Sequence, residues 1–158
     1  MTLVRLLGGG MILCSGAIAA YASVRRERGR IRVLEAWISL LSYIRGQIDL
    51  YMTPLSEILA GADPALLATL GTLSPAPTLE DCFAASADRL DEESRRLLIG
   101  YLADLGSAYR ETELKRCDAC LAALSSQRKK MADELPARLR LAVGLRLCFS
   151  LGATIVLW

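Results

Sequence analysis

An uncharged stretch of nineteen residues, 6–24, constrains the fold of this chain more than any other feature. As a helix it would extend about 28 Å, close to the thickness of the hydrocarbon core of a bilayer. Positive charge marks the cytoplasmic flank of a membrane helix, so we expect a transmembrane helix in 1–24 and a cytoplasmic location for the residues after it. The arginines directly after this stretch are also expected to bind anionic lipid headgroups. They are Arg25, Arg26, Arg28, Arg30 and Arg32.

A cleavable signal peptide is the alternative interpretation of this start. The triplets Ala17-Ile18-Ala19 and Ala20-Tyr21-Ala22 resemble signal peptidase sites after an apolar run. The run is long for a signal peptide, however, and most of the positive charge comes after it rather than before it. We therefore favour an uncleaved anchor.

A second apolar segment, 139–158, comes after the central part of the chain, and its last twelve residues carry no charge. Arg140 can extend to the membrane interface, whereas Arg146 would lie deeper at a greater cost. We expect a second transmembrane helix, with a buried core helix or an in-plane amphipathic helix as alternatives. The predicted organisation is a transmembrane helix in 1–24, a cytoplasmic helical domain in 25–138 and a transmembrane helix in 139–158.

Charge is divided unevenly along the predicted domain. Residues 35–127 contain fourteen acids and seven bases, whereas further bases collect at the two membrane-proximal edges. A nucleic-acid-binding domain would carry basic charge on its body, so the pattern argues against that class. The chain has no histidine, which removes the commonest general base and metal ligand. Its five cysteines are scattered and odd in number, which favours a reducing compartment over a disulfide framework.

Apolar spacing predicts an all-α domain, because no useful strand-like alternation is present. The helix after Thr78 is predicted to bury Phe83, Ala84, Ala87 and Leu90. Helices are expected to begin at cap signals and to end at glycine, while a proline breaks or kinks the last helix. These signals are Thr53-Pro54, Asp63-Pro64, Thr78 with Asp81, and 91–93 as starts, Gly61 and Gly106 as stops, and Pro136. The fold class is a small antiparallel helix bundle of about six helices, flanked by N- and C-terminal transmembrane helices.

The last helix of the domain, from about Thr112, carries an apolar seam with three- and four-residue spacing. Such a seam resembles a short antiparallel coiled-coil arm. Its members are Leu114, Cys117, Leu121, Leu124, Met131 and Leu135, with Arg128 at one seam position. If the seam pairs with a second copy, the chain is a membrane-anchored regulator or sensor that self-associates. If the seam packs inside the monomer, that hypothesis loses its basis.

Candidate chemistry is sparse. Cys117 and Cys120 form a CxxC, but a zinc site needs about four ligands, so packing in the core is the favoured interpretation. The acids at 91–93 and 111–113 lie at helix starts, where they stabilise the helix dipole. Gly16 and Ala20 either let another helix approach closely or are ordinary membrane-helix composition. We therefore predict no enzyme, no cofactor, no metal and no small-molecule substrate.

Long polar side chains interrupt two apolar helices and form a candidate partner-binding surface. Its residues are Arg45, Gln47, Asp49, Tyr109, Arg110, Glu113, Arg116 and Asp118. For each residue alone, a salt bridge within the bundle is the simpler explanation. For the surface as a whole we favour docking. Replacing Glu113 and Asp118 by lysine is then expected to weaken partner binding in a salt-sensitive way and to leave the fold intact.

The layout resembles the stage III sporulation protein AB family over nearly the whole chain. Each motif alone is weak, and the order and spacing together are more specific. The residues that carry the resemblance are 43–48 (YIRGQI), 53–59 (TPLSEIL), Leu105-Gly106, Tyr109-Arg110, 116–118 (RCD) and 134–136 (ELP). Arg146 departs from the pattern in the second apolar segment.

The resemblance implies a component of the channel complex between mother cell and forespore, in the inner membrane of the mother cell. It also implies a domain similar to the cytoplasmic domain of type II secretion protein F, a platform that meets a hexameric secretion ATPase. The partners implied here are the sporulation ATPase of the same operon and other membrane components of the channel. The acidic region 35–127 is a plausible face for the ATPase.

Overall fold

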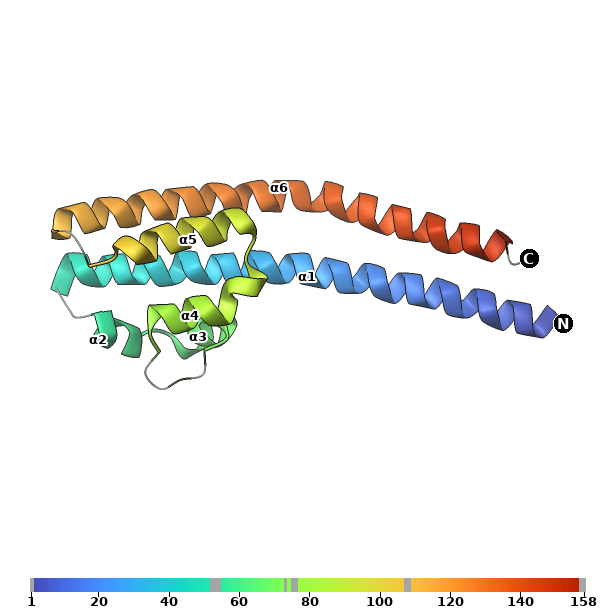
Figure 1. Ribbon diagram of the computed structural model, residues 1–158, viewed down its shortest axis with the longest axis horizontal. Helices are drawn as coiled ribbons and strands as arrows, with labels where there is room; N and C mark the ends of the chain where they lie inside the picture. The colour runs from blue at the N-terminus through green and yellow to red at the C-terminus, as the bar shows by residue number, and fades with distance from the viewer. Residues whose placement is uncertain (1, 52–54, 73, 75–76, 107–108, 157–158) are drawn as a thin grey trace. The chain divides into compact units, whose positions relative to one another are not determined.

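The chain is almost entirely helical in the computed structural model, which describes residues 2–51, 55–72, 74, 77–106 and 109–156. Side chains are not described for residues 2–14, 17, 50–51, 138, 142–143, 145–147 and 149–156. The described residues form six α-helices, one 3₁₀ helix and no strand, so the all-α prediction is confirmed (Figure 1). The elements are α1 (Thr2–Tyr51), α2 (Leu55–Ala60), α3 (Pro64–Leu70), α4 (Leu79–Ser86), η1 (Ala87–Arg89), α5 (Glu92–Asp104) and α6 (Arg110–Val156).

The chain divides into two compact units, each containing part of α1 and part of α6. One unit comprises Met1–Arg28 and Ala132–Trp158, and the other is Gly29–Met131. We call the second unit the helical domain. In the first unit Ala20 is only 7% exposed, so the small residue predicted to allow close helix approach is buried there.

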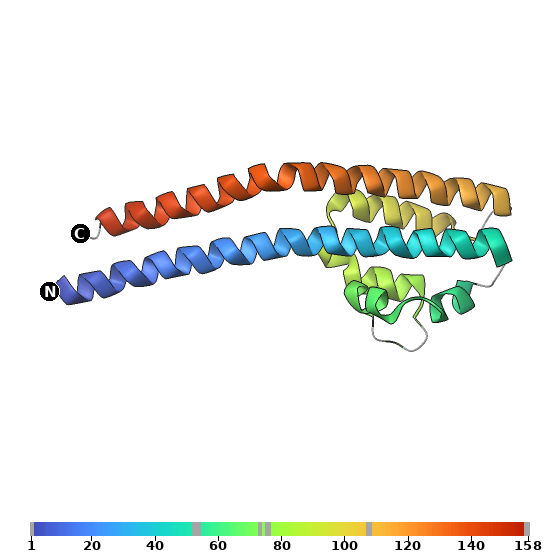
Figure 2. The ribbon, with the colours of Figure 1, turned by 180° about the vertical axis from the view of Figure 1, so that it is seen from behind.

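Within the helical domain, α1 and α6 run antiparallel and side by side (Figures 1 and 2). Ion pairs join Glu35 to Arg128 and Arg45 to Asp118, so residue numbers rise along one helix as they fall along the other. The helices α2, α3 and α4 lie on the side of α1 that faces away from α6. This arrangement places α1 at the centre of the domain.

The core of the domain forms around α1. Trp37, Leu40, Leu41 and Ile44 are fully buried, at the three- and four-residue spacing of one helix face. The indole N–H of Trp37 donates a hydrogen bond of 2.9 Å to the Ser86 hydroxyl. That hydroxyl in turn donates to the Cys82 carbonyl oxygen at 2.7 Å, so both buried polar groups are satisfied.

Local signals determine where the short helices begin. Asp63 accepts from the Ala65 N–H at the start of α3, with Pro64 at the first helical position. Thr78 and Asp81 form a reciprocal capping box at the start of α4, as predicted. Asp91 caps α5 by accepting from the Ser94 N–H. The fourth predicted cap, Thr53-Pro54, lies outside the described residues.

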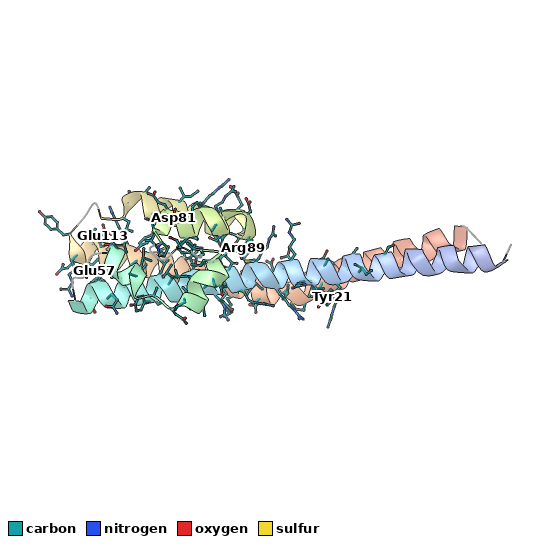
Figure 3. All side chains as sticks on the ribbon, turned by 90° about the horizontal axis from the view of Figure 1, so that it is seen from below. Tyr21, Glu57, Asp81, Arg89 and Glu113 are labelled. Atoms are coloured by element: carbon teal, nitrogen blue, oxygen red, sulfur yellow. The ribbon has the colours of Figure 1, made fainter. Side chains whose placement is uncertain are left out.

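The end of α3 shows why a glycine stands at position 71. Gly71 has φ +98°, a left-handed conformation that favours glycine. Arg89 donates to the carbonyl oxygens of Thr69 and Leu70, and a side chain at position 71 would meet its guanidinium at 2.8 Å. Arg89 therefore ties η1 to the end of α3 (Figure 3).

Two predictions about helices are wrong in part. Leu90 is buried as predicted and Phe83 packs half-buried against the core, but Ala84 is exposed, and the buried residues of α4 are Leu79, Cys82 and Ser86. Ser86 accepts a hydrogen bond from Trp37, which lies 49 residues away in the sequence. This bond favours burial of the α4 face that carries Ser86. The second concerns Pro136, where a break or a kink was predicted: α6 continues through that residue, so the break is wrong. A proline removes one backbone hydrogen bond, and the flanking turns keep theirs.

Among the residues whose side chains are described, no helix is long and apolar enough to cross a membrane. Most side chains of the predicted segments 6–24 and 139–158 lie outside that set. The two transmembrane helices therefore stay predictions.

Candidate functional site

The predicted docking residues gather at one end of the helical domain, where α1 ends and α6 begins. We call this region the α1–α6 end. It contains all eight predicted residues, which the fold brings together from two helices: Arg45, Gln47, Asp49, Tyr109, Arg110, Glu113, Arg116 and Asp118. Antiparallel pairing explains why residues more than 60 positions apart meet there.

Arg45 and Asp118 form a two-point ion pair across the helices. Nε and Nη2 of Arg45 donate to the two carboxylate oxygens of Asp118 at 2.5 and 3.1 Å. Hydrogen bonding lowers the pKa of the Asp118 carboxyl, outweighing the smaller effect of desolvation, and raises the pKa of Arg45. Both charges are thus neutralised within the monomer.

Arg110 and Asp49 form the second cross-helix pair of the α1–α6 end. The guanidinium of Arg110 donates to the backbone carbonyl oxygen of Asp49 and, at 3.1 Å, to its carboxylate. The last turn of an α-helix leaves carbonyl groups without helical partners. Arg110 therefore satisfies one such group near the end of α1.

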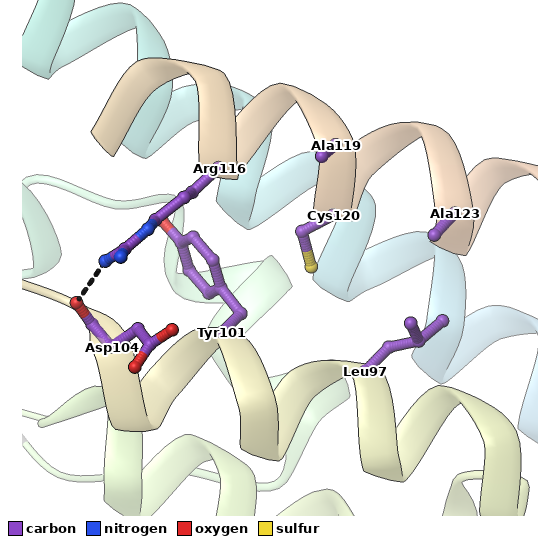
Figure 4. A pocket seen from close by; sticks show the side chains of 7 residues that line it. All are labelled: Leu97, Tyr101, Asp104, Arg116, Ala119, Cys120 and Ala123. Carbon is purple, nitrogen blue, oxygen red and sulfur yellow. Dashed lines mark hydrogen bonds between the residues drawn. The ribbon is translucent and has the colours of Figure 1, made fainter. Parts of the chain in front are cut away.

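Glu113 is a poor docking residue because it is only 9% exposed. Its carboxylate lies 3.9 Å from the guanidinium of Arg116, which donates to the Asp104 carbonyl oxygen at 3.2 Å (Figure 4). Placing lysine at position 113 would bury a like charge beside Arg116. The burial of Glu113 therefore argues against the prediction that this substitution leaves the fold intact.

Tyr109 differs from its neighbours because its side chain is almost wholly in solvent, at 91% exposure. Gln47 on the facing helix is half-buried. An exposed aromatic beside ion pairs that are already formed has no packing role in the monomer. It is the one large apolar group that the α1–α6 end, as far as its side chains are described, offers to a partner.

A groove between α5 and α6 was not predicted. It encloses about 270 Å³ and is largely apolar, with polar groups of Asp104 and Arg116 at one end (Figure 4). Leu97, Tyr101, Asp104, Arg116, Ala119, Cys120 and Ala123 line it. Alanines opposite larger α5 side chains are the sequence signal for it, but the pairing of α5 with α6 had to be known first.

The cysteines of the domain pack in the core. Cys82, Cys117 and Cys120 are buried, and burial raises the pKa of each thiol, that of Cys120 to about 11. The Cys117 thiol donates to the Leu41 carbonyl oxygen at 3.7 Å. Among the residues described, no group of three His, Cys, Asp or Glu side chains is placed to hold a metal ion. The CxxC therefore behaves as part of the α1–α6 packing.

The apolar seam of α6 also packs inside the monomer. Cys117 and Leu124 are 1% and 0% exposed, and Leu121 and Met131 pack against the same core. Cys117 and Leu124 at the centre of the seam are therefore not available to pair with a second copy.

Three acids of α2, α4 and η1 lie in a stretch of the sequence that lacks bases. No lysine or arginine occurs in residues 46–88. Among the described side chains, Glu57, Glu80 and Asp88 take part in no ion pair, whereas Glu35, Glu92 and Asp118 each pair with a base. We call Glu57, Glu80 and Asp88 the α2–η1 acids. A plot of bases along the sequence would have found this stretch, because its signal is a lack of bases.

Comparison with known proteins identifies one family. The family model of stage III sporulation protein AB matches residues 5–158. No curated protein and no solved structure matches the chain.

Proposed function

The chain belongs to the stage III sporulation protein AB family and is a sporulation protein, and from this premise we propose that it acts as a non-enzymatic membrane platform. The complex it serves is a secretion-like channel between mother cell and forespore. Its helical domain docks a secretion-type ATPase, and its membrane segments contact other components of the channel. No cofactor is needed for this role.

The observation that carries the docking proposal is the exposure of Tyr109. Interface hot spots are enriched in tyrosine, tryptophan and arginine, and a polar rim commonly surrounds them. Tyr109 is 91% exposed and adjoins Arg110, whose pairing with Asp49 is complete without a partner. Binding can therefore bury an aromatic ring without first breaking an internal ion pair.

We propose that residues 6–24 and 139–158 anchor the platform in the mother-cell membrane. The support is the uncharged length of the first segment and the dense arginines directly after it. That charge order places the helical domain in the cytoplasm, where a secretion ATPase would be found.

A self-associating regulator is the competing hypothesis, and its structural basis was the α6 seam. Because Cys117 and Leu124 are buried in the monomer core, the seam does not offer a pairing surface. We therefore prefer the platform to the regulator.

The docking proposal is tested by binding of the ATPase to the full chain in lipid nanodiscs. Tyr109→Ala is compared with Ile99→Ala, which truncates another exposed apolar side chain, 48% exposed on α5. Loss of a hot-spot aromatic costs about 2 kcal/mol or more, so we expect Kd to rise about thirtyfold or more for Tyr109→Ala alone. Equal affinity of the two variants would remove Tyr109 from the docking surface.

A further inference from the structure

One face of α1 changes along the helix from an aliphatic residue to an aromatic residue and then to arginines. Ile18, Tyr21, Arg25 and Arg28 are separated by three, four and three residues, so a helix of 3.6 residues per turn presents them as one stripe. All four are exposed, Ile18 at 69% and Tyr21 at 70%. Figure 3 labels Tyr21 on this helix. We call them the α1 stripe, and they all lie in the unit Met1–Arg28 with Ala132–Trp158.

The opposite face of the same helix is the packed one. Ala20 is buried, and Gly16 and Glu27 are half-buried. The α1 stripe is therefore the surface that this part of α1 leaves to its surroundings.

The charges of the stripe are not neutralised by any side chain that the structure describes. Arg25 and Arg28, with the neighbouring exposed Arg26, take part in no ion pair among the residues whose side chains are described. By contrast, Arg45, Arg110 and Arg128 all pair with carboxylates in the helical domain. An anion from outside the chain can bind these three arginines of α1 without displacing a carboxylate.

The order along the stripe matches the layers of a bilayer leaflet. An aliphatic residue suits the hydrocarbon, an aromatic residue the interface, and arginine the headgroup layer. Ile18 and Arg28 are ten residues apart, or about 15 Å along a helix, which spans the edge of the hydrocarbon and the interfacial layer. On α6, within the same unit, the order along the chain is reversed: exposed Arg140 precedes Leu141, which is 72% exposed.

We infer that the α1 stripe, together with the neighbouring Arg26, is a binding surface for anionic lipid. Arg25, Arg26 and Arg28 bind the headgroup phosphates, and Tyr21 lies at the interface. This inference rests on the proposed membrane anchoring. The lipid class is the one expected from the sequence, and the structure adds Ile18 and Tyr21 to the surface and selects Arg25, Arg26 and Arg28 from the five arginines. An acidic protein is the other possible occupant. It would need an apolar and aromatic surface continuous with its acidic one to match Ile18 and Tyr21.

The test measures lipid selectivity of the full chain reconstituted in bilayers. Spin-labelled phosphatidylglycerol and phosphatidylcholine report how much of each lipid is immobilised at the protein surface. One arginine near an anionic surface strengthens association about fivefold, so we expect a phosphatidylglycerol preference of about that size or more. The triple variant Arg25→Gln, Arg26→Gln and Arg28→Gln should reduce the preference to about one. The control Arg95→Gln, Arg96→Gln and Lys115→Gln removes the same charge from the helical domain and should keep it.

Each alternative result overturns the inference. Equal immobilisation of the two lipids by the wild-type chain would do so while leaving the anchor in place, and would point to another occupant. The inference would also be overturned if the triple variant kept the phosphatidylglycerol preference. The same holds if high salt left the preference of the wild-type chain unchanged. Immobilisation of neither lipid would overturn the inference and the membrane anchor together.

Discussion

Arg45 on α1 holds Asp118 on α6 through two hydrogen bonds, of 2.5 and 3.1 Å, across 73 residues of sequence. Glu35 with Arg128 and Asp49 with Arg110 extend the same antiparallel pairing on either side. A shift of one helix along the other would separate these partners and place like or neutral groups together. The pairs therefore favour one register of α1 on α6. Two of them, Asp49 with Arg110 and Arg45 with Asp118, lie at the same end of the domain as Tyr109.

Acid should destabilise the domain through three aspartates. Hydrogen bonds lower the pKa of Asp81 and Asp118, and at Asp91 they outweigh the opposing effect of burial. A carboxyl with a lowered folded-state pKa binds more protons when unfolded, so its stabilising effect is complete above about pH 4 and is lost as pH falls through the folded pKa. We expect denaturation midpoints to fall steadily below about pH 4.

The measurement is urea unfolding monitored by Trp37 fluorescence in a Trp158→Phe background. Asp118→Asn should flatten the acid dependence, whereas Asp133→Asn, an exposed acid outside the ion pairs of the described side chains, should leave it unchanged. Identical profiles for wild type and Asp118→Asn would show that this pair does not contribute to the pH dependence.

Removing the Ser86 hydroxyl should destabilise the domain, because the buried Trp37 N–H then has no acceptor. The expected cost is about 1–3 kcal/mol in the free energy of unfolding. Ser125→Ala is the matched control on an exposed face of α6 and should be close to neutral. In a double-mutant cycle with Trp37→Phe, the two effects should be clearly less than additive. Strict additivity would mean that the hydrogen bond contributes nothing to stability.

Features set by neighbouring residues were the ones the sequence predicted well. The caps at Asp63 and Thr78 and the stops at Gly61 and Gly106 all depend on a few adjacent residues. The buried face of α4 was missed because Ser86 is polar, and only its distant partner Trp37 makes burial favourable. Predictions that need the identity of a packing partner fail from one sequence alone.

The candidate site shows the same division. The sequence pattern placed Arg45 and Asp118 in the same predicted docking surface, but it did not predict the ion pair between them. Glu113 looked as accessible as its neighbours, although it is 9% exposed once α6 packs on the bundle. The groove beside Cys120 needs the α5–α6 contact and has no signature in either helix alone.

The α2–η1 acids should make docking of the ATPase dependent on salt. Uncompensated negative charge speeds association with a basic surface, and salt screens that attraction. The variant Glu57→Gln, Glu80→Gln and Asp88→Asn should slow association and weaken its salt dependence. The control Glu93→Gln, Glu111→Gln and Asp133→Asn removes the same charge elsewhere. An equal effect of both variants would mean that only net charge matters.

The buried thiols should be unreactive in the folded chain. Because the pKa of Cys120 is raised to about 11, its thiolate is scarce at pH 8, and burial also blocks access. In a chain with Cys14 and Cys148 replaced by serine, we expect iodoacetamide to label the native protein far more slowly than the urea-unfolded protein. Comparable rates in the two states would contradict the packing of Cys82, Cys117 and Cys120.

Site-specific photo-cross-linking at Tyr109 in sporulating cells tests the central claim most directly. A photoreactive phenylalanine analogue replaces Tyr109 in the full chain, and the same analogue at Ile99 on α5 is the control. The platform account predicts an adduct with the secretion-type ATPase at position 109 that is weak or missing at position 99. Adducts at position 109 that contain only proteins from outside the cytoplasm would contradict both the docking surface and the orientation of the domain.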